Sequence, residues 1–286
     1  MIIIRLGSDV LNDLSMLDKL QNAVIADDDK KNKQSSNKEY HFDKLKMYFG
    51  EDYNYKGIII SMPTIGDILE VGEDRFYKSL SLFLYNSTSI RVFLWDNCNE
   101  TDWNKVKDIE VFSIMNHLIQ DKEPLKLLFK NLFFDDFQLV PVKREVDDEI
   151  YELALYSERQ NIWLYEEDYI QIAEYVREML NIHPKVEKAK GKTAKAWILQ
   201  EDRMNMRNQE EKNVANLLSL VSACVNHPGF KYKLQELKAV GIYQFMDSVK
   251  RLQKYENSTA AMKGLYSGFV DSKSLNPELI NFMGDI

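Results

Sequence analysis

Cys224 and His227 stand three positions apart, a spacing that suits half of a zinc site or a Cys–His nucleophilic pair. Structural zinc needs four ligands in paired spacing, but the chain has only one other Cys and three other His, all isolated. Cys224 also lies in an aliphatic run, where burial raises the pKa of a thiol and opposes its activation. We therefore expect neither a metal ion nor a nucleophile there, and no cofactor elsewhere.

Gly191-Lys192-Thr193 has the ending of a phosphate-binding loop. That motif needs another glycine five residues before the Gly-Lys pair, and Val186 occupies the position. Without the glycine-rich turn, the backbone N–H groups do not form an anion nest. We interpret this segment as a solvated, basic entry to a helix.

Paired acids at 135–136, 147–149 and 166–168 are the residue types that a metal-dependent nuclease uses. Such an enzyme needs its carboxylates to converge from separate elements. The sequence places these acids at strand ends and at a helix start, where solvation and the helix dipole account for them. A metal-dependent DNA-processing enzyme stays an alternative function, but we expect no enzymatic activity.

Charge is segregated along the chain. Residues 145–168 contain nine acids and one base, Arg159, whereas residues 185–195 contain five lysines against Glu187. The lysines are Lys185, Lys188, Lys190, Lys192 and Lys195. Oppositely charged patches on one chain suit head-to-tail association or a charged partner. Nucleic acid is a poor candidate, because the net charge is −8 and only Trp197 lies near the lysines.

The composition is that of a soluble globular protein, with 45% hydrophobic and 29% charged residues among 286. Its 11 Gly and 6 Pro are scarce and favour helices over a sandwich or barrel of many short strands. Two cysteines and the absence of an export-length apolar run at the N-terminus point to a reducing, cytoplasmic compartment. No apolar stretch is long enough to span a membrane, so we expect no membrane partner.

Hydrophobic periodicity predicts an α+β fold, predominantly helical, with a small mixed β part followed by an all-helical C-terminal part. Capping signals at Thr64 and Asp67 start a helix that bends at Gly72 and reaches about Tyr85. The other elements expected in the first part are a hairpin over 45–60, a strand or buried helix over 90–95, helices over 104–119 and 124–132, a meander of strands at 137–142, 150–156 and 161–165, and a helix over 169–180 that stops before Pro184.

The C-terminal part is expected to begin with a helix over 194–226, whose apolar half, 214–225, should be buried on most sides. His227-Pro228-Gly229 breaks that helix, an amphipathic helix follows over 242–255, and Asn276-Pro277 caps a last short one. Residues 26–40 hold no large aliphatic side chain and read as a flexible charged tether. The predicted domains are thus an N-terminal segment with its tether, 1–40, an α+β domain, 41–184, and a helical domain, 185–286.

Two stretches are distinctive as strings. One is Met62–Tyr77 with Arg91–Asp96, and the other is Val225–Tyr232 with Ile242–Gln253 and Gly264–Phe269. They resemble uncharacterised proteins from the tail-morphogenesis region of phages and prophages of Gram-positive bacteria, over roughly residues 44–286. These proteins are treated as tail assembly chaperone-like or as minor tail-structural components.

The resemblance implies a protein that works by protein–protein contact in the host cytoplasm or in the virion, with a tape-measure or tail-tube protein as partner. A tail assembly chaperone is the favoured function, and a minor virion component of the tail or neck is the alternative. Homo-oligomers are also possible from the charge pattern. The candidate partner-binding residues are the lysines Lys188, Lys190, Lys192 and Lys195 and the apolar C-terminal positions Met246, Tyr255, Met262, Leu265, Tyr266 and Phe269.

Overall fold

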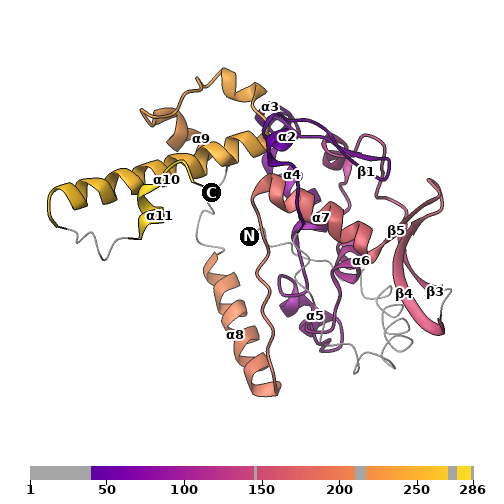
Figure 1. Cartoon of the computed structure of the whole chain (residues 1–286). Coiled ribbons are helices and arrows are strands. Elements are labelled where there is room, and N and C mark those ends of the chain that lie inside the picture. The colour runs from indigo at the N-terminus through magenta and orange to yellow at the C-terminus, as the bar shows by residue number, and fades with distance from the viewer. Residues whose placement is uncertain (1–39, 145–146, 210–216, 270–275, 285–286) are drawn as a thin grey trace.

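The structure is a computed structural model, and it describes residues 40–144, 147–209, 217–269 and 276–284 (Figure 1). The predicted N-terminal segment and most of its tether therefore lie outside the described residues. The fold is α+β and mostly helical, with small sheets in the first part and helices in the C-terminal part, as predicted. None of the helices within the described ranges has the length and apolar composition needed to cross a bilayer.

The elements of the first part are α2 (Lys44–Tyr48), β1 (Tyr53–Tyr55), β2 (Ile58–Ile60), α3 (Ile65–Val71), α4 (Glu73–Leu84), α5 (Arg91–Asn97), α6 (Asp108–Leu118), the 3-10 helix η3 (Glu123–Leu127), β3 (Phe137–Arg144), β4 (Asp147–Ser157), β5 (Ile162–Tyr165) and α7 (Glu166–Leu180). Those of the C-terminal part are α8 (Lys192–Gln209), α9 (Leu217–Asn226), the 3-10 helix η4 (Glu236–Ala239), α10 (Ile242–Tyr266) and α11 (Pro277–Ile280).

The first half of the predicted hairpin is a short helix instead. The alternation over 45–49 favours a strand, but a carboxylate oxygen of Asp43 accepts hydrogen bonds from the backbone N–H groups of Leu45 and Lys46, both at 3.1 Å. This cap satisfies the first donors of α2 and selects the helix. The hairpin lies wholly within residues 53–60, where Lys56 and Gly57 both take positive φ, as a tight two-residue turn requires.

The capping signals at Thr64 are confirmed. Its hydroxyl accepts from the N–H of Asp67 at 3.1 Å, and the Asp67 carboxylate accepts from the N–H of Thr64 at 2.8 Å. The expected bend at Gly72 separates α3 from α4, and the glycine has a φ of +95° that L side chains rarely adopt. This pair of helices forms one side of the core.

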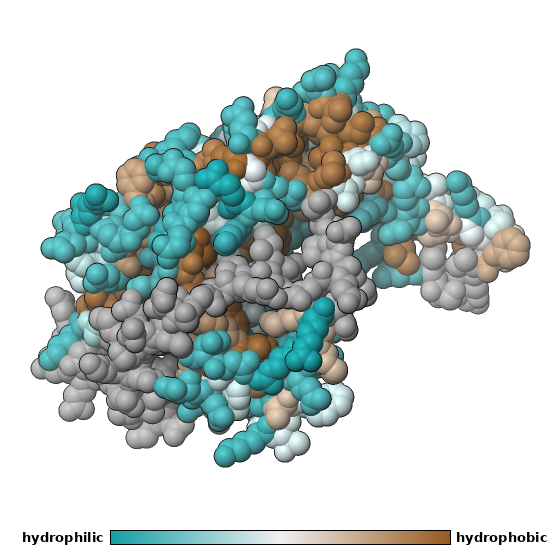
Figure 2. Space-filling model, turned by 180° about the vertical axis from the view of Figure 1, so that it is seen from behind, coloured by the Kyte–Doolittle hydropathy of each residue, from teal (hydrophilic) through white to brown (hydrophobic). Residues whose placement is uncertain are grey.

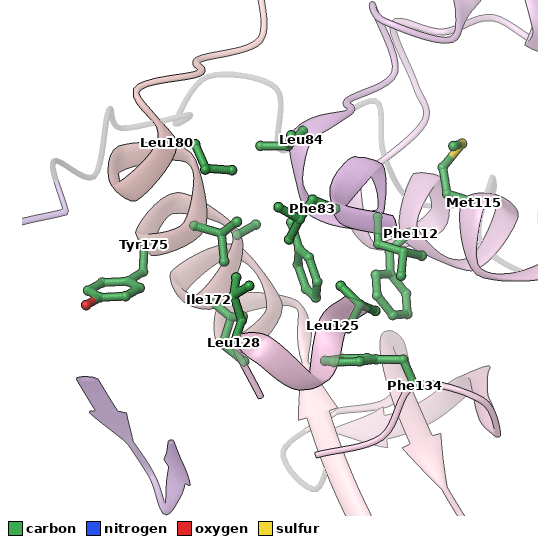
Figure 3. Packing of buried hydrophobic residues seen from close by; sticks show 14 of the residues in the cluster. Phe83, Leu84, Phe112, Met115, Leu125, Leu128, Phe134, Ile172, Tyr175 and Leu180 are labelled. Atoms are coloured by element: carbon green, nitrogen blue, oxygen red, sulfur yellow. The ribbon is translucent and has the colours of Figure 1, made fainter. Parts of the chain in front are cut away.

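The core is an aromatic cluster around Phe83 of α4. Its ring lies 5.9 Å from the ring of Phe112 on α6 and 5.3 Å from that of Phe134, and Ile172 of α7 lies nearby on another side (Figure 3). Arg177 of α7 is buried beside these rings and donates to the carbonyl of Phe83 at 2.8 Å. The cluster therefore joins α4, α6 and α7 by both packing and hydrogen bonding.

The remaining predictions for the first part are largely confirmed. The ambiguous run over 90–95 is the helix α5, and the helix over 104–119 begins later, at α6. The helix expected from Pro124 is only the short η3. The meander is present, with antiparallel order β3-β4-β5, and α7 ends at Asn181, whose left-handed backbone stops the helix before Pro184.

The buried hydrophobic residues form one cluster that runs from Met47 to Phe245 and so includes residues of both predicted domains. The start of α10 contributes Ile242 and Phe245, both 0% exposed, while the rest of this helix projects away from the body (Figure 1). The break at 227–229, the amphipathic helix α10 and the cap of α11 at Asn276 are as predicted. The domain boundary at residue 184 stays a prediction.

Candidate interaction surface

A groove of about 500 Å³ lies between α9 and α10. Its α9 wall carries Leu220, Ala223 and Cys224, and its α10 wall carries Val249 and Leu252. Polar groups line the rest: His227, Gln253, Glu256 and Asn257. An apolar groove with a few polar groups at its margin suits an amphipathic helix better than a charged ligand.

The turn after α9 fixes this helix against α10. The Nδ1 atom of His227 accepts from the N–H of Gly229 at 3.0 Å, so Nε2 carries the proton and donates to Oε1 of Glu256 at 3.1 Å. A Cβ at Gly229 would lie 3.0 Å from the His227 ring, so a larger residue would push the imidazole away from Glu256. The turn thus connects the two walls through one histidine.

Helix α9 contradicts the expectation that it is buried on most sides. Only Leu217 and Cys224 of its residues are buried, and Leu218 is 69% exposed. The helix holds no charged residue, and Leu218 and Ala223 are its exposed apolar residues, whereas Val221 and Val225 are half-buried against the core. Figure 2 shows a hydrophobic area at the upper edge of the molecule, over the region where α9 lies. An uncharged helix face with an exposed leucine, left open by the elements that the structure describes, suits contact with another protein.

The predicted apolar partner-binding residues fall into three environments. Met246 lies near the start of α10 and packs against the core, so it is not part of a free surface. Met262 and Leu265 are half-buried. The other three are exposed: Tyr255 by 45%, Tyr266 by 78% and Phe269 by 91%, with the ring of Phe282 standing edge-on to Tyr255 at 5.6 Å. The six residues are not among those that line the groove.

The predicted basic segment, residues 185–191, has an extended backbone, and we call it the strap. Every second residue of the strap accepts a hydrogen bond through its carbonyl group. The carbonyls of Lys185, Glu187 and Ala189 accept side-chain hydrogen bonds from Asn86, Trp103 and Asn104 at 2.8–3.1 Å. Alternate residues therefore point outward, and Lys188 and Lys190 are exposed. Lys192, at the start of α8, is exposed as well. These lysines are available to a partner.

Lys195 has a structural role instead. Its Nζ atom lies 2.6 Å from Asp102 and over the ring of Trp103, and its side chain is 16% exposed. Beside it, Arg91 donates to both oxygens of Asp202 and, at 2.7 Å, to Glu187. These ion pairs hold α8 and the strap on α5. Lys195 is therefore engaged within the molecule, unlike Lys188, Lys190 and Lys192, with which the sequence groups it.

The residue pairs with possible catalytic chemistry do not converge within the described part of the chain. Asp136 accepts from the hydroxyl of Ser157 and the N–H of Arg159, which closes the β4–β5 turn. Glu166 pairs with Lys107 at 3.0 Å, and Asp168 with Lys56 at 2.6 Å. The side chains of 147–149 lie outside the described residues. Among the described residues no three His, Cys, Asp or Glu side chains gather as metal ligands would.

Cys224 is 4% exposed, and its burial raises the pKa of the thiol, as expected from its aliphatic neighbours. The residues that sequence reasoning missed are those of the α9 surface, Leu218 and Ala223 above all. The signal was present as an apolar run without a charge, but such a run is equally typical of a buried helix.

Residues 207–286 match the family model of the YomV second domain. No curated protein and no solved structure matches the chain. The matched region contains α9, the turn at His227, α10 and α11, and therefore the whole groove. YomV is a Bacillus phage or prophage protein, so the match relates these C-terminal helices to a phage protein family.

Proposed function

We propose that this protein acts in phage tail morphogenesis by protein–protein contact, as an assembly chaperone that binds a tape-measure-type helical protein in the groove between α9 and α10. The observation that carries the proposal is the uncharged α9, which leaves Leu218 69% exposed beside an apolar groove. A tape-measure-type protein exposes apolar helix faces until the tail tube surrounds it. A complementary groove would cover such faces and keep the client soluble.

The spacing of the apolar residues along the groove suits a client helix. Val249 and Leu252 are spaced by three positions on α10, and Leu220 faces them from α9. A client helix with apolar residues at i, i+3 and i+7 can place successive side chains along such a row. The polar pair of His227 and Glu256 at the margin would then contact the polar side of that helix.

The family match supports a phage role for the region that forms the groove, and the resemblance of Met62–Tyr77 and Ile242–Gln253 to tail-module proteins supports the assignment to the tail. The site of action would be the host cytoplasm before the tail is complete. A minor virion component is the alternative, and it differs in that the protein would stay in the finished particle.

Co-expression with the candidate client tests the proposal. Ala223→Glu places a charge in the groove at an exposed helical alanine, and Ala196→Glu makes the same change at an exposed position of α8. We expect the client to stay soluble with the wild type and with Ala196→Glu, and to aggregate with Ala223→Glu. Equal client solubility with all three proteins, or without any of them, would overturn the chaperone function. Recovery of the protein in purified virions would favour the alternative.

A further inference from the structure

A second exposed surface lies on the three-stranded sheet. The register places Tyr156 of β4 opposite Trp163 of β5, with stacked rings 4.3 Å apart, and Ala154 opposite Tyr165. Val140 of β3 lies beside Ala154 on the same face. We call Val140, Tyr156, Trp163 and Tyr165 the aromatic face. The opposite face of the sheet carries Leu139, Leu155 and Leu164 and packs on α6 and α7.

The aromatic face is open to a partner. Trp163 is 43% exposed and Tyr165 is 40% exposed. A shift of β5 by one residue would have moved both side chains to the buried face of the sheet, but the register keeps them on the exposed one. Trp and Tyr at an exposed site are the residues that most often supply the binding energy of an interface. Stacked aromatic rings also attract a Lys ammonium group through their negative faces.

The surroundings of the aromatic face are acidic. Two of its strands, β4 and β5, belong to the segment 145–168, with nine acids and one base, whereas β3 ends with Lys143 and Arg144. Glu152 lies opposite Val142 on the same side of the sheet. Glu158, at the turn between β4 and β5, is exposed as well. A fitting partner therefore carries exposed lysines together with an apolar or aromatic group.

The strap of the same chain has this chemistry. Lys188 and Lys190 point outward between pinned residues, Val186 is 72% exposed, and Trp197 on the first turns of α8 is 71% exposed. Because the strap carbonyls are held by hydrogen bonds, its backbone is already ordered and loses little further entropy on binding.

Within one molecule the two surfaces cannot meet. Figure 1 shows the sheet at one side of the fold, while the strap and α8 lie apart from it, beyond α5. The hydrogen bonds of the strap to Asn86, Trp103 and Asn104 keep it there. A contact between strap and aromatic face therefore joins different copies of the chain.

We propose that the protein self-associates head to tail, with the strap of one copy bound on the aromatic face of the next. Lys188 and Lys190 would lie over the Tyr156–Trp163 stack and toward Glu152 of β4. Because the two surfaces differ, such a contact is heterologous and produces rings or open filaments rather than a closed two-fold dimer. The groove between α9 and α10 takes no part, so this inference is independent of the proposed function.

Sedimentation velocity of the full chain over a range of concentrations tests this. Trp163→Ala removes the largest ring of the aromatic face, and the double variant Lys188→Glu/Lys190→Glu reverses the two charges that the strap presents to it. We expect the wild type to form species larger than dimers, each variant to be monomeric, and an equimolar mixture of the two variants to form dimers only. The mixture keeps one working strap and one working face, which permits one contact and no extension.

The matched control for the strap is Lys231→Glu/Lys233→Glu, which changes the same charge at two exposed lysines with the same spacing. It should associate as the wild type does. For the aromatic face, Tyr266→Ala at a 78% exposed position is the control. Circular dichroism verifies that each variant is folded. A wild type that is monomeric throughout, strap variants that still associate, or a variant mixture without dimers would each overturn the proposal.

Discussion

The backbone N–H of Ile65 donates a 2.9 Å hydrogen bond to the carbonyl of Val240. Two residues after Val240, the N–H of Ile242 donates to the carbonyl of Pro63, also at 2.9 Å. The capping turn before α3 is thereby joined to the start of α10. Met62–Tyr77 and Ile242–Gln253, which are far apart in sequence, meet at this short bridge. The groove is consequently built on a helix whose first turn is part of the main core.

Gly66→Ala should weaken this junction. A Cβ at this position would lie 2.7 Å from the carbonyl oxygen of Lys238, a contact that the backbone of η4 must move to relieve. We expect a loss of about 1–3 kcal/mol in the free energy of unfolding, typical of an overpacked site. Urea unfolding followed by circular dichroism measures it. A variant as stable as the wild type would mean that η4 does not press on α3.

Phe245→Ala should cost about 3–5 kcal/mol of unfolding free energy, because Phe245 is 0% exposed and anchors the first turns of α10 in the core. Phe269→Ala is the matched control, since its ring is 91% exposed and its removal should change stability by less than about 0.5 kcal/mol. Thermal and urea unfolding of both variants gives the comparison. Similar losses for the two would contradict the assignment of Phe245 to the core.

Local signals explain which elements could be predicted from the sequence. Thr64 with Asp67, and Asn276 with Pro277, satisfy helix ends through residues within one turn, so their effect is visible in sequence. Helix α9 shows the opposite case. Its apolar run predicts burial, but burial depends on whether another element covers Leu218, and none of the described elements does so completely.

The strap and the aromatic face depend on tertiary structure in the same way. The lysines of 185–195 look equivalent in sequence, yet hydrogen bonds from Asn86 and Trp103 decide which residues point outward. Lys195 turns inward because α8 places it next to Asp102. For the sheet, the alternation within β5 was visible, but it shows only that two faces exist. Packing of α6 and α7 determines that Trp163 is on the open one.

Acid should loosen the strap. Hydrogen bonds from Arg91 and Lys185 lower the pKa of Glu187. Its carboxylate therefore stabilises the folded strap above its unfolded pKa of about 4.3, and that contribution is lost as the pH falls through the lower folded value. We expect hydrogen exchange of 185–191, corrected for its intrinsic pH dependence, to show less protection near pH 3 than at pH 6. Glu187→Gln should lack this step, and an identical pH response in the two proteins would exclude Glu187 as its origin.

Cys224 should report on the occupancy of the groove. The thiol lines the groove, is 4% exposed and has a pKa raised by burial, so its thiolate is scarce at neutral pH and alkylation should be slow. In a Cys98→Ser background, the alkylation rate should rise about tenfold per pH unit until the pH passes this raised pKa.

A peptide with an amphipathic helical sequence taken from the client should slow the reaction in proportion to its binding, because it covers the sulfur. The same peptide should have no effect in the Ala223→Glu variant, whose groove is blocked, while Ala196→Glu should behave as the Cys98→Ser parent. Rapid alkylation in the free protein would contradict the burial of the thiol. An unchanged rate with saturating peptide would mean that the client binds elsewhere.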